Sequence, residues 1–194
     1  AMTCCQIGHA GCKGSTRVGW EGMDQPLASK NWPLLSASVI PWSDDNAKPK
    51  AMDREDMNAV KAEFVAATQM ADRAGFDMIE LHAAHGYLVS SFISPLSNSR
   101  SDEYGGSLDN RMRYPLEVFV AMRAVWPENK PMSVRISASD WAGDDGVTAD
   151  EAVPIAMTVE GGGGGIIVVS AGPTSSPGKP VYARPPKHNW SSLR

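Results

Sequence analysis

The first clear pattern in the chain is a helical one. Between Asp53 and Gly75, apolar residues recur every three or four positions and therefore share one face of a helix. These residues are Met57, Val60, Phe64, Ala67 and Ala71. Asp53 suits the N-cap position and Gly75 suits the end of a helix. The pattern therefore predicts one amphipathic helix over this segment.

Two more helices are predicted downstream. Ser107 suits the N-cap of the first. The residues expected to face inward from it are Met112, Leu116, Phe119 and Val120. Thr148 and Glu151 have the spacing of a capping box and indicate a third helix. We expect that helix to be short or kinked, because Pro154 lies inside it and the glycines 161–165 follow.

Short apolar segments alternate with these helices and are typical of strands. They are residues 3–7, 77–81, 131–136 and 166–170. Alternating strands and helices imply parallel pairing through right-handed crossovers. The longest remaining stretches, 8–52 and 82–106, are interpreted as loops. An open four-stranded α/β sheet and part of a (β/α)8 barrel both fit, and either would place function at the carboxyl ends of the strands.

The residues that best indicate chemistry follow the second strand. His82 and His85 lie where that strand leaves the sheet, and each neutral imidazole can donate one hydrogen bond to a shared ligand. Two donors on one oxygen would withdraw electron density from a conjugated alkene, and Tyr87 could deliver a proton beside it. The alternatives are a polar loop whose histidines satisfy backbone groups, and a metal site that His9 completes.

Two strand residues each allow a structural and a functional interpretation. Arg135 is a permanent cation in an apolar strand and needs an anionic partner. Glu80 in the neighbouring strand could be that partner, or Arg135 could stabilise an anionic cofactor ring. Gln6 could pair with the edge of a heterocycle, because its amide both donates and accepts hydrogen bonds, or it could be an ordinary core amide.

Composition narrows the class of protein. The chain has 194 residues with 42% hydrophobic and 21% charged residues, which is typical of a globular domain. It has no apolar stretch long enough for a transmembrane helix and no signal-peptide pattern. A net charge of -4 argues against nucleic-acid binding. Cys4, Cys5 and Cys12 have no CxxC spacing, which indicates free thiols in the reducing cytosol and hence a cytoplasmic protein.

Three stretches resemble the old yellow enzyme family of flavin oxidoreductases. They are residues 6–13, which read QIGHAGCK, residues 75–111, which contain HAAHGYL, SPLSN and DEYGGS, and residues 134–137. The resemblance implies that residues 1–184 form part of a (β/α)8 TIM barrel, from about its third strand to its sixth. Residues 185–194 no longer follow the family and are interpreted as a divergent tail.

The resemblance also implies a reaction and its residues. In this family NAD(P)H reduces FMN, and the reduced flavin passes hydride to an activated alkene. His82 and His85 are then expected to bind the activating oxygen of the substrate, and Tyr87 to donate the proton. Gln6 and Arg135 are expected to contact the flavin. No residue is assigned to a metal.

A closer resemblance concerns residues 20–27, which read WEGMDQPL, and residues 36–38. Both are similar to the reductase-like half of salicylyl-CoA hydroxylase and 2-aminobenzoyl-CoA monooxygenase/reductase proteins. That resemblance implies an aromatic acyl-CoA, or its dearomatised product, as the substrate.

The chain also departs from the family. It is shorter than the roughly 250 residues that a full barrel needs, and Cys12 stands where the family has arginine. A second hypothesis is therefore a non-catalytic half-barrel that does not hold FMN, and a third is a metal-dependent enzyme that uses His82 and His85. Unpaired strand edges at 3–7 and 166–170 lead us to expect self-association.

Overall fold

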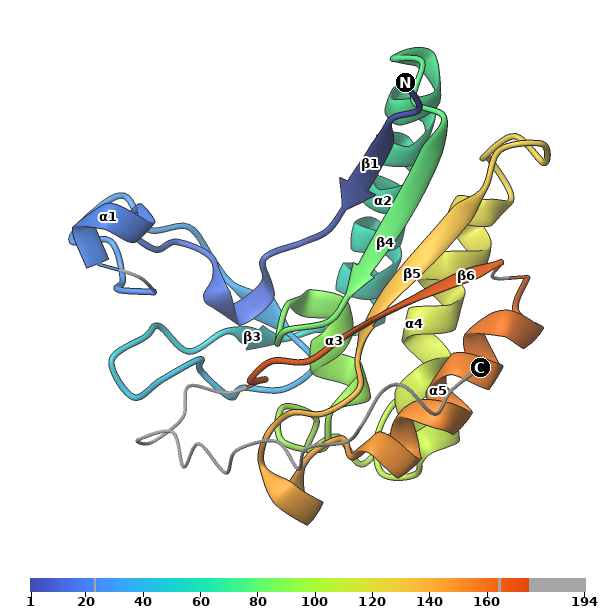
Figure 1. Ribbon diagram of the computed structural model, residues 1–194. Helices are drawn as coiled ribbons and strands as arrows, with labels where there is room; N and C mark the ends of the chain where they lie inside the picture. Colours follow the sequence, from blue (N-terminus) through green and yellow to red (C-terminus); the bar gives the residue numbers. More distant parts are fainter. Residues whose placement is uncertain (23, 164, 175–194) are drawn as a thin grey trace.

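A four-stranded parallel sheet forms the centre of the molecule in the computed structural model, which describes residues 1–22, 24–163 and 165–174 (Figure 1). The strands lie in the order β1-β4-β5-β6. Their bounds are Cys4–Ile7, Met78–Ala83, Met132–Ser137 and Ile166–Ser170. All neighbouring pairs are parallel, so the four predicted strands and their parallel pairing are confirmed.

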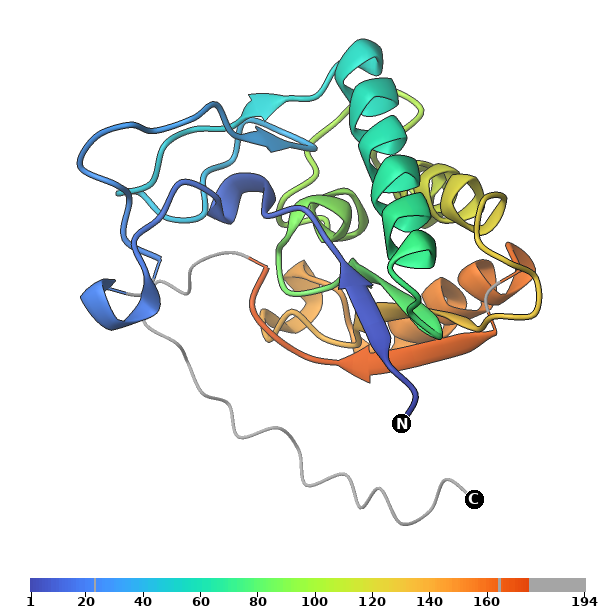
Figure 2. The same cartoon turned by 90° about the horizontal axis from the view of Figure 1, so that it is seen from above.

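Three long helices lie on the same side of this sheet (Figure 2). They are α2 (Arg54–Arg73), α4 (Leu108–Arg123) and α5 (Ala149–Gly161). Side chains alternate between the two faces of a strand, so each strand sends every second residue toward these helices. Ile79, Leu81, Val134 and Ile136 belong to that face and are fully buried. This face and the helices form the hydrophobic core.

The opposite face of the sheet carries polar side chains in register. Gln6, Glu80 and Ser133 are aligned across β1, β4 and β5 in one row. His82 and Arg135 are aligned in the next row toward the carboxyl ends. In the part of the chain that the structure describes, no helix covers this face. The sheet therefore separates an apolar face that holds the fold together from a polar face that is available for binding.

The predicted helices are present, with one error of orientation. Asp53 caps α2 through a capping box with Asp56, as its sequence pattern indicated. Ser107 caps α4, but Val120 on that helix is 49% exposed, so its predicted inward position is wrong. The buried face of α4 is instead centred on Tyr114, Val118 and Met122. Val120 is apolar and lies beside that face, so the periodicity wrongly placed it inside.

Helix α5 extends over 13 residues and continues through Pro154. Thr148 caps its first turn, as predicted, and its side chain accepts a hydrogen bond from the Glu151 amide. The helix ends only where the glycines begin, at Gly161. The glycines, whose flexible backbone disfavours a helix, therefore set its length, and the proline does not end it.

The segment predicted as a polar loop after the second strand is partly wrong. Strand β4 continues through His82 and Ala83, and helix α3 (Leu88–Ile93) follows with all six residues buried. Its serines have both local and distant partners. Ser91 donates to the Leu88 carbonyl at 2.6 Å and accepts from the distant Ala37 amide at 3.0 Å, and Ser90 accepts from the Gly86 amide at 3.3 Å. Buried hydroxyls with such partners gave the segment its polar sequence.

The long segment after β1 is mostly irregular, as predicted. It contains the single turns η1 (Gly11–Lys13) and α1 (Gly19–Gly22) and a small separate sheet. That sheet pairs β2 (Leu35–Ser36) with β3 (Lys50–Ala51) in parallel. A further single turn, η2 (Gly143–Asp145), follows β5. None of the helices in the described part of the chain is long and apolar enough to cross a bilayer.

Arg111 ties three elements together inside the protein. It is 5% exposed, and its guanidinium donates hydrogen bonds to the carbonyls of Ile93 and Gly106 and pairs with Glu151 at the start of α5. Removing one partner of a buried ion pair is costly, because the charge of the other partner is left without compensation. Arg111, shortly after the DEYGGS segment, therefore holds the ends of α3, α4 and α5 together.

We expect Arg111→Met to lower the free energy of unfolding by about 3 kcal/mol, because it leaves Glu151 without its buried partner. Urea unfolding followed by circular dichroism would measure this. Arg113→Met, which changes an exposed arginine two positions away, should cost less than about 1 kcal/mol. Adding Glu151→Leu to the Arg111 variant should restore part of the loss. Equal effects of the two single substitutions would contradict this role for Arg111.

Candidate active site

His82 lies on the polar face near the end of β4 and is 9% exposed. Its Nδ1 accepts a hydrogen bond from the Ala84 amide at 3.2 Å. An imidazole nitrogen that accepts from an amide carries no proton, so this contact assigns the proton of the neutral ring to Nε2. The backbone of the strand end therefore fixes one hydrogen-bond donor of the site.

His85 lies beside it, at the point where the chain leaves β4. The two rings meet edge to face, with centroids 5.2 Å apart. The His85 backbone has a φ of 60°, and its amide donates to Ser137 Oγ at 3.0 Å. His85 Nε2 lies 2.6 Å from Ser170 Oγ. The ends of β4, β5 and β6 thus converge on this histidine, and sequence reasoning missed both serines.

Neither imidazole is suited to carry a second proton, and with it a positive charge, at neutral pH. Burial lowers the pKa of His82 to about 4, and the neighbouring side chains of His85 and Arg135 act in the same direction. Burial also lowers the pKa of His85, and Arg135 and Lys13 act in the same direction. Both side chains are therefore neutral near pH 7, where each has one N–H to donate and no charge.

Tyr87 lies against His82, with ring centroids 4.8 Å apart and planes at 82°. The structure thus brings the three residues of the HAAHGY segment into one cluster. Lys13 approaches from the loop after β1, and its ammonium lies 3.9 Å from the Trp42 ring centroid and 5.0 Å from that of Tyr87. Burial lowers the pKa of Lys13, which Asp24 partly opposes. Sequence reasoning did not single out this lysine.

Gln6, Glu80 and Arg135 form a second polar cluster on the same face. Gln6 Nε2 donates to Glu80 Oε1 at 2.6 Å, and Arg135 Nε donates to the same oxygen at 2.8 Å. The Arg135 side chain is 30% exposed and that of Glu80 only 8%. The ion pair with Glu80, one of the two alternatives for Arg135, is therefore present, and the flavin contacts expected of Gln6 and Arg135 stay predictions.

The metal interpretation finds no third ligand among residues 1–22, 24–163 and 165–174. Within them, no three His, Cys, Asp or Glu side chains gather in a geometry that could hold an ion. The Nδ1 of His9 already accepts a hydrogen bond from the Gly11 amide at 3.0 Å. The histidine cluster is thus better suited to hydrogen bonding than to metal binding.

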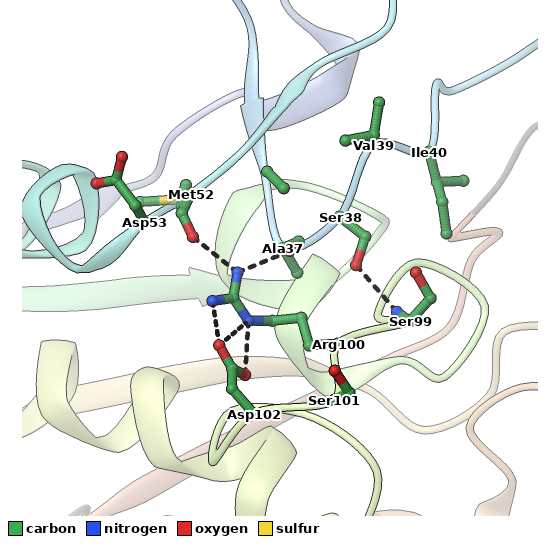
Figure 3. A pocket seen from close by; sticks show the side chains of 11 residues that line it. Ala37, Ser38, Val39, Ile40, Met52, Asp53, Ser99, Arg100, Ser101 and Asp102 are labelled. Carbon is green, nitrogen blue, oxygen red and sulfur yellow. Dashed lines mark hydrogen bonds and ion pairs between the residues drawn. The ribbon is translucent and has the colours of Figure 1, made fainter.

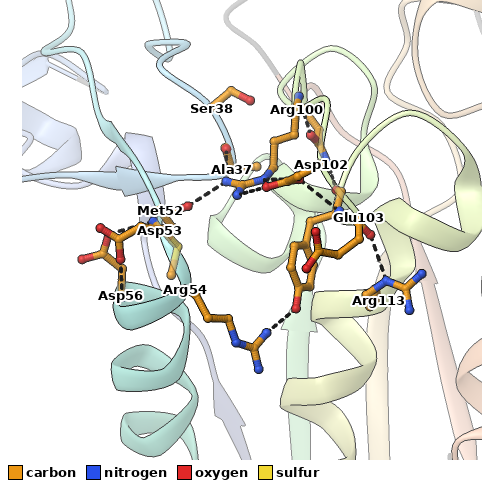
Figure 4. A network of polar contacts seen from close by, with 12 residues as sticks. Ala37, Ser38, Met52, Asp53, Arg54, Asp56, Arg100, Asp102, Glu103 and Arg113 are labelled. Atoms are coloured by element: carbon orange, nitrogen blue, oxygen red, sulfur yellow. Dashed lines mark hydrogen bonds and ion pairs between the residues drawn. The ribbon is translucent and has the colours of Figure 1, made fainter.

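A separate surface cavity of about 500 Å³ lies between β3, the start of α2 and the loop at 99–102 (Figure 3). Arg100 lines it, but its guanidinium already bonds the carbonyls of Ala37 and Met52 and forms an ion pair with Asp102 at 2.5 Å. Figure 4 shows this arginine within the polar network that joins the loop to α2. Its hydrogen bonds are structural, and none of the predicted site residues lines this cavity.

Comparison with known proteins identifies relatives of this chain. The sequence profile described as the NADH:flavin oxidoreductase / NADH oxidase family fits residues 23–163. An NADH:flavin oxidoreductase from Gibberella zeae is 43% identical over 160 residues, which cover 80% of this chain and 38% of that protein. An NADPH dehydrogenase from Clostridium acetobutylicum is 40% identical over 156 residues, which cover 80% of this chain and 42% of that protein.

Comparison with solved structures identifies the fold. A 2-naphthoyl-CoA reductase bound to 2-naphthoyl-CoA superposes with a TM-score of 0.75 at 25% identity, over 90% of this chain and 27% of that one. The histamine dehydrogenase from Rhizobium sp. 4-9 gives 0.74 at 26% identity, over 89% and 24%. The prediction of a partial (β/α)8 barrel is confirmed, and the chain spans about two fifths of the curated relatives.

The pKa of His82 predicts how stability depends on pH. Folding keeps this ring neutral, so between pH 6.5 and about 4 the folded state binds fewer protons than the unfolded chain. Its contribution to stability is therefore complete above pH 6.5 and is lost as the pH falls toward about 4. Urea unfolding between these pH values should show this loss, and His82→Gln should reduce it. An NMR titration of His82 with a midpoint near 6.5 would contradict this prediction.

Proposed function

The chain belongs to the NADH:flavin oxidoreductase / NADH oxidase family, the old yellow enzyme family, and from this we propose that it acts in an FMN-dependent oxidoreductase. The proposed reaction passes hydride from NAD(P)H, by way of FMN, to an activated alkene or an aromatic acyl-CoA derivative. The observation that carries the proposal is the cluster of neutral His82 and His85 with Tyr87 at the carboxyl end of β4.

The polar face of the sheet has groups that fit the edge of a flavin. The Gln6 amide donates to Glu80 and leaves its oxygen without a partner among the described residues. Arg135 uses only Nε in this part of the chain, so its terminal nitrogens stay available as donors. An acceptor and a cation side by side suit the N–H and carbonyl groups of a flavin pyrimidine ring. FMN would supply the two-electron chemistry, and these residues would orient it.

His82 and His85 have the role of binding the substrate. Their rings lie side by side at one strand end. Two neutral donors on a carbonyl oxygen would polarise the conjugated double bond without adding a charge. Ser170 satisfies His85 Nε2 at 2.6 Å until a substrate oxygen replaces it. Tyr87, in contact with His82, then delivers a proton to the carbon that does not receive hydride.

The substrate class is best supported as an aromatic acyl-CoA or its dearomatised product. A thioester carbonyl conjugated to a ring activates the double bonds of that ring, and its oxygen can accept hydrogen bonds from two neutral donors. The similarity to a 2-naphthoyl-CoA reductase and the sequence resemblance of residues 20–27 both point to this class. Lys13 adds a cation beside Tyr87, and such a cation would attract an anionic substrate.

A visible spectrum of the chain, taken after mixing with FMN and desalting, tests the proposal. We expect retained flavin absorbance and oxidation of NAD(P)H in the presence of a cyclic enone. Tyr87→Phe should lower the rate of enone reduction by about 100-fold, because it removes the proton donor, and should leave reduction of the flavin by NAD(P)H unchanged. A colourless protein would support the alternative of a non-catalytic half-barrel.

We also propose that this chain associates with itself when it is isolated. Among the described residues, β1 and β6 each pair with a strand on one side only. Ile166 and Val169 on β6 are 42% and 57% exposed. Strand edges with free backbone groups and apolar side chains pair readily with other chains.

Light scattering coupled to size exclusion would measure this association. We expect dimers or larger species at micromolar concentration, and we expect Ile166→Lys to shift them toward monomer, because a charge at the edge opposes pairing. Val18→Lys changes an exposed valine away from the sheet and serves as the control. A monodisperse monomer of the unmodified chain would rule out the proposal.

A further inference from the structure

Glu80 is a buried carboxylate at the centre of the polar face, and the proposed function gives it no role. It is 6% exposed and lies on β4 between the two neighbouring strands. Its Oε1 accepts from Gln6 on β1 and from Arg135 on β5, and its Oε2 accepts from Ser133 at 3.2 Å. Among the described residues, its hydrogen-bond partners Gln6, Arg135 and Ser133 therefore all donate to it.

Glu80 is ionised near pH 7. Burial alone would raise the pKa of its carboxyl group, but the hydrogen bonds from Gln6 and Arg135 outweigh burial and hold that pKa below its ordinary value. An ionised carboxylate only accepts hydrogen bonds. Consequently the Gln6 amide must turn its NH₂ group toward Glu80 and its oxygen toward the open face. The carboxylate thus decides which end of the amide a ligand meets.

Glu80 acts on Arg135 in two ways. The hydrogen bond to Nε at 2.8 Å fixes one edge of the guanidinium plane and leaves the terminal nitrogens free among the described residues. The negative charge also offsets the positive charge of the guanidinium, since Arg135 is bonded to it and partly buried. A ligand beside Arg135 therefore meets an oriented donor whose charge is largely balanced.

We propose that Glu80 is the positioning residue for the flavin: it orients Gln6 as an acceptor and Arg135 as a donor, and its charge sets how strongly Arg135 favours reduced over oxidised FMN. This inference rests on the proposed function, because it requires FMN at this face. Reduced flavin carries additional negative charge near Arg135, so removal of the Glu80 charge should favour the reduced form.

Two substitutions separate orientation from charge. Glu80→Gln keeps the size of the side chain but removes the charge and lets the Gln6 amide turn either way. Glu80→Asp keeps the charge but is one methylene shorter, so it cannot keep all of the hydrogen bonds. Glu128→Gln removes the same charge from an exposed position after α4 and is the matched control. Circular dichroism would verify that each variant is folded.

The measurements are the dissociation constant of oxidised FMN, from quenching of its fluorescence, and the midpoint potential of the bound flavin. Both Glu80 variants should bind oxidised FMN about tenfold more weakly. Glu80→Gln alone should also shift the ratio of affinities toward reduced FMN by about tenfold, which equals about 30 mV for a two-electron couple. Glu128→Gln should change neither quantity. An NMR spectrum without flavin should show that Glu80→Gln alters the side-chain amide signals of Gln6.

The possible outcomes are distinguishable. If the unmodified chain binds FMN and both Glu80 variants match it in affinity and potential, the inference is overturned and the proposed function stands. If the unmodified chain binds no FMN, the proposed function fails for this chain and the inference fails with it. If Glu80→Gln does not fold, Glu80→Asp decides, because it keeps the charge that Arg135 requires; unchanged binding by that variant would overturn the orienting role.

Discussion

The register of β4 between β1 and β5 is the constraint on which the rest of the structure depends. This alignment places Gln6, Glu80 and Ser133 in one row and His82 beside Arg135 in the next. Because side chains alternate across a strand, the same register sends the intervening apolar residues into the core. A shift of one residue would bury Glu80 and His82 among the helices, so the core and the candidate site are specified together.

Charge on the polar face is arranged so that few groups are left uncompensated. Glu80 balances Arg135, while His82 and His85 avoid the cost of a buried charge by remaining neutral. The lowered pKa values and the presence of Arg135 are linked, since a nearby cation disfavours a second one. Among the described residues, this face therefore offers neutral imidazole donors beside the balanced ion pair of Glu80 and Arg135.

The loops at the carboxyl ends of the strands owe their positions to buried polar contacts. Asp140, after β5, accepts hydrogen bonds from Ser94, the Val147 amide and Thr174, and so connects the loops that follow β4, β5 and β6. Arg111 does the same for α3, α4 and α5. The chain covers about two fifths of its curated relatives, yet this part holds its histidine cluster through contacts within itself.

The sequence by itself determined the four strands, the three long helices with their caps, and His82, His85 and Tyr87 as candidates, because periodicity, capping and spacing are local properties. It did not predict α3, because its serines look like loop residues until their hydrogen-bond partners are known. One of these partners, the Ala37 amide, comes from a distant segment, and another, the Leu88 carbonyl, is local. Only the tertiary structure decided that Ser137 and Ser170 hold His85 and that Glu80 joins Gln6 to Arg135. Those contacts join residues more than 50 positions apart in the sequence, and only the pairing of the strands brings them together.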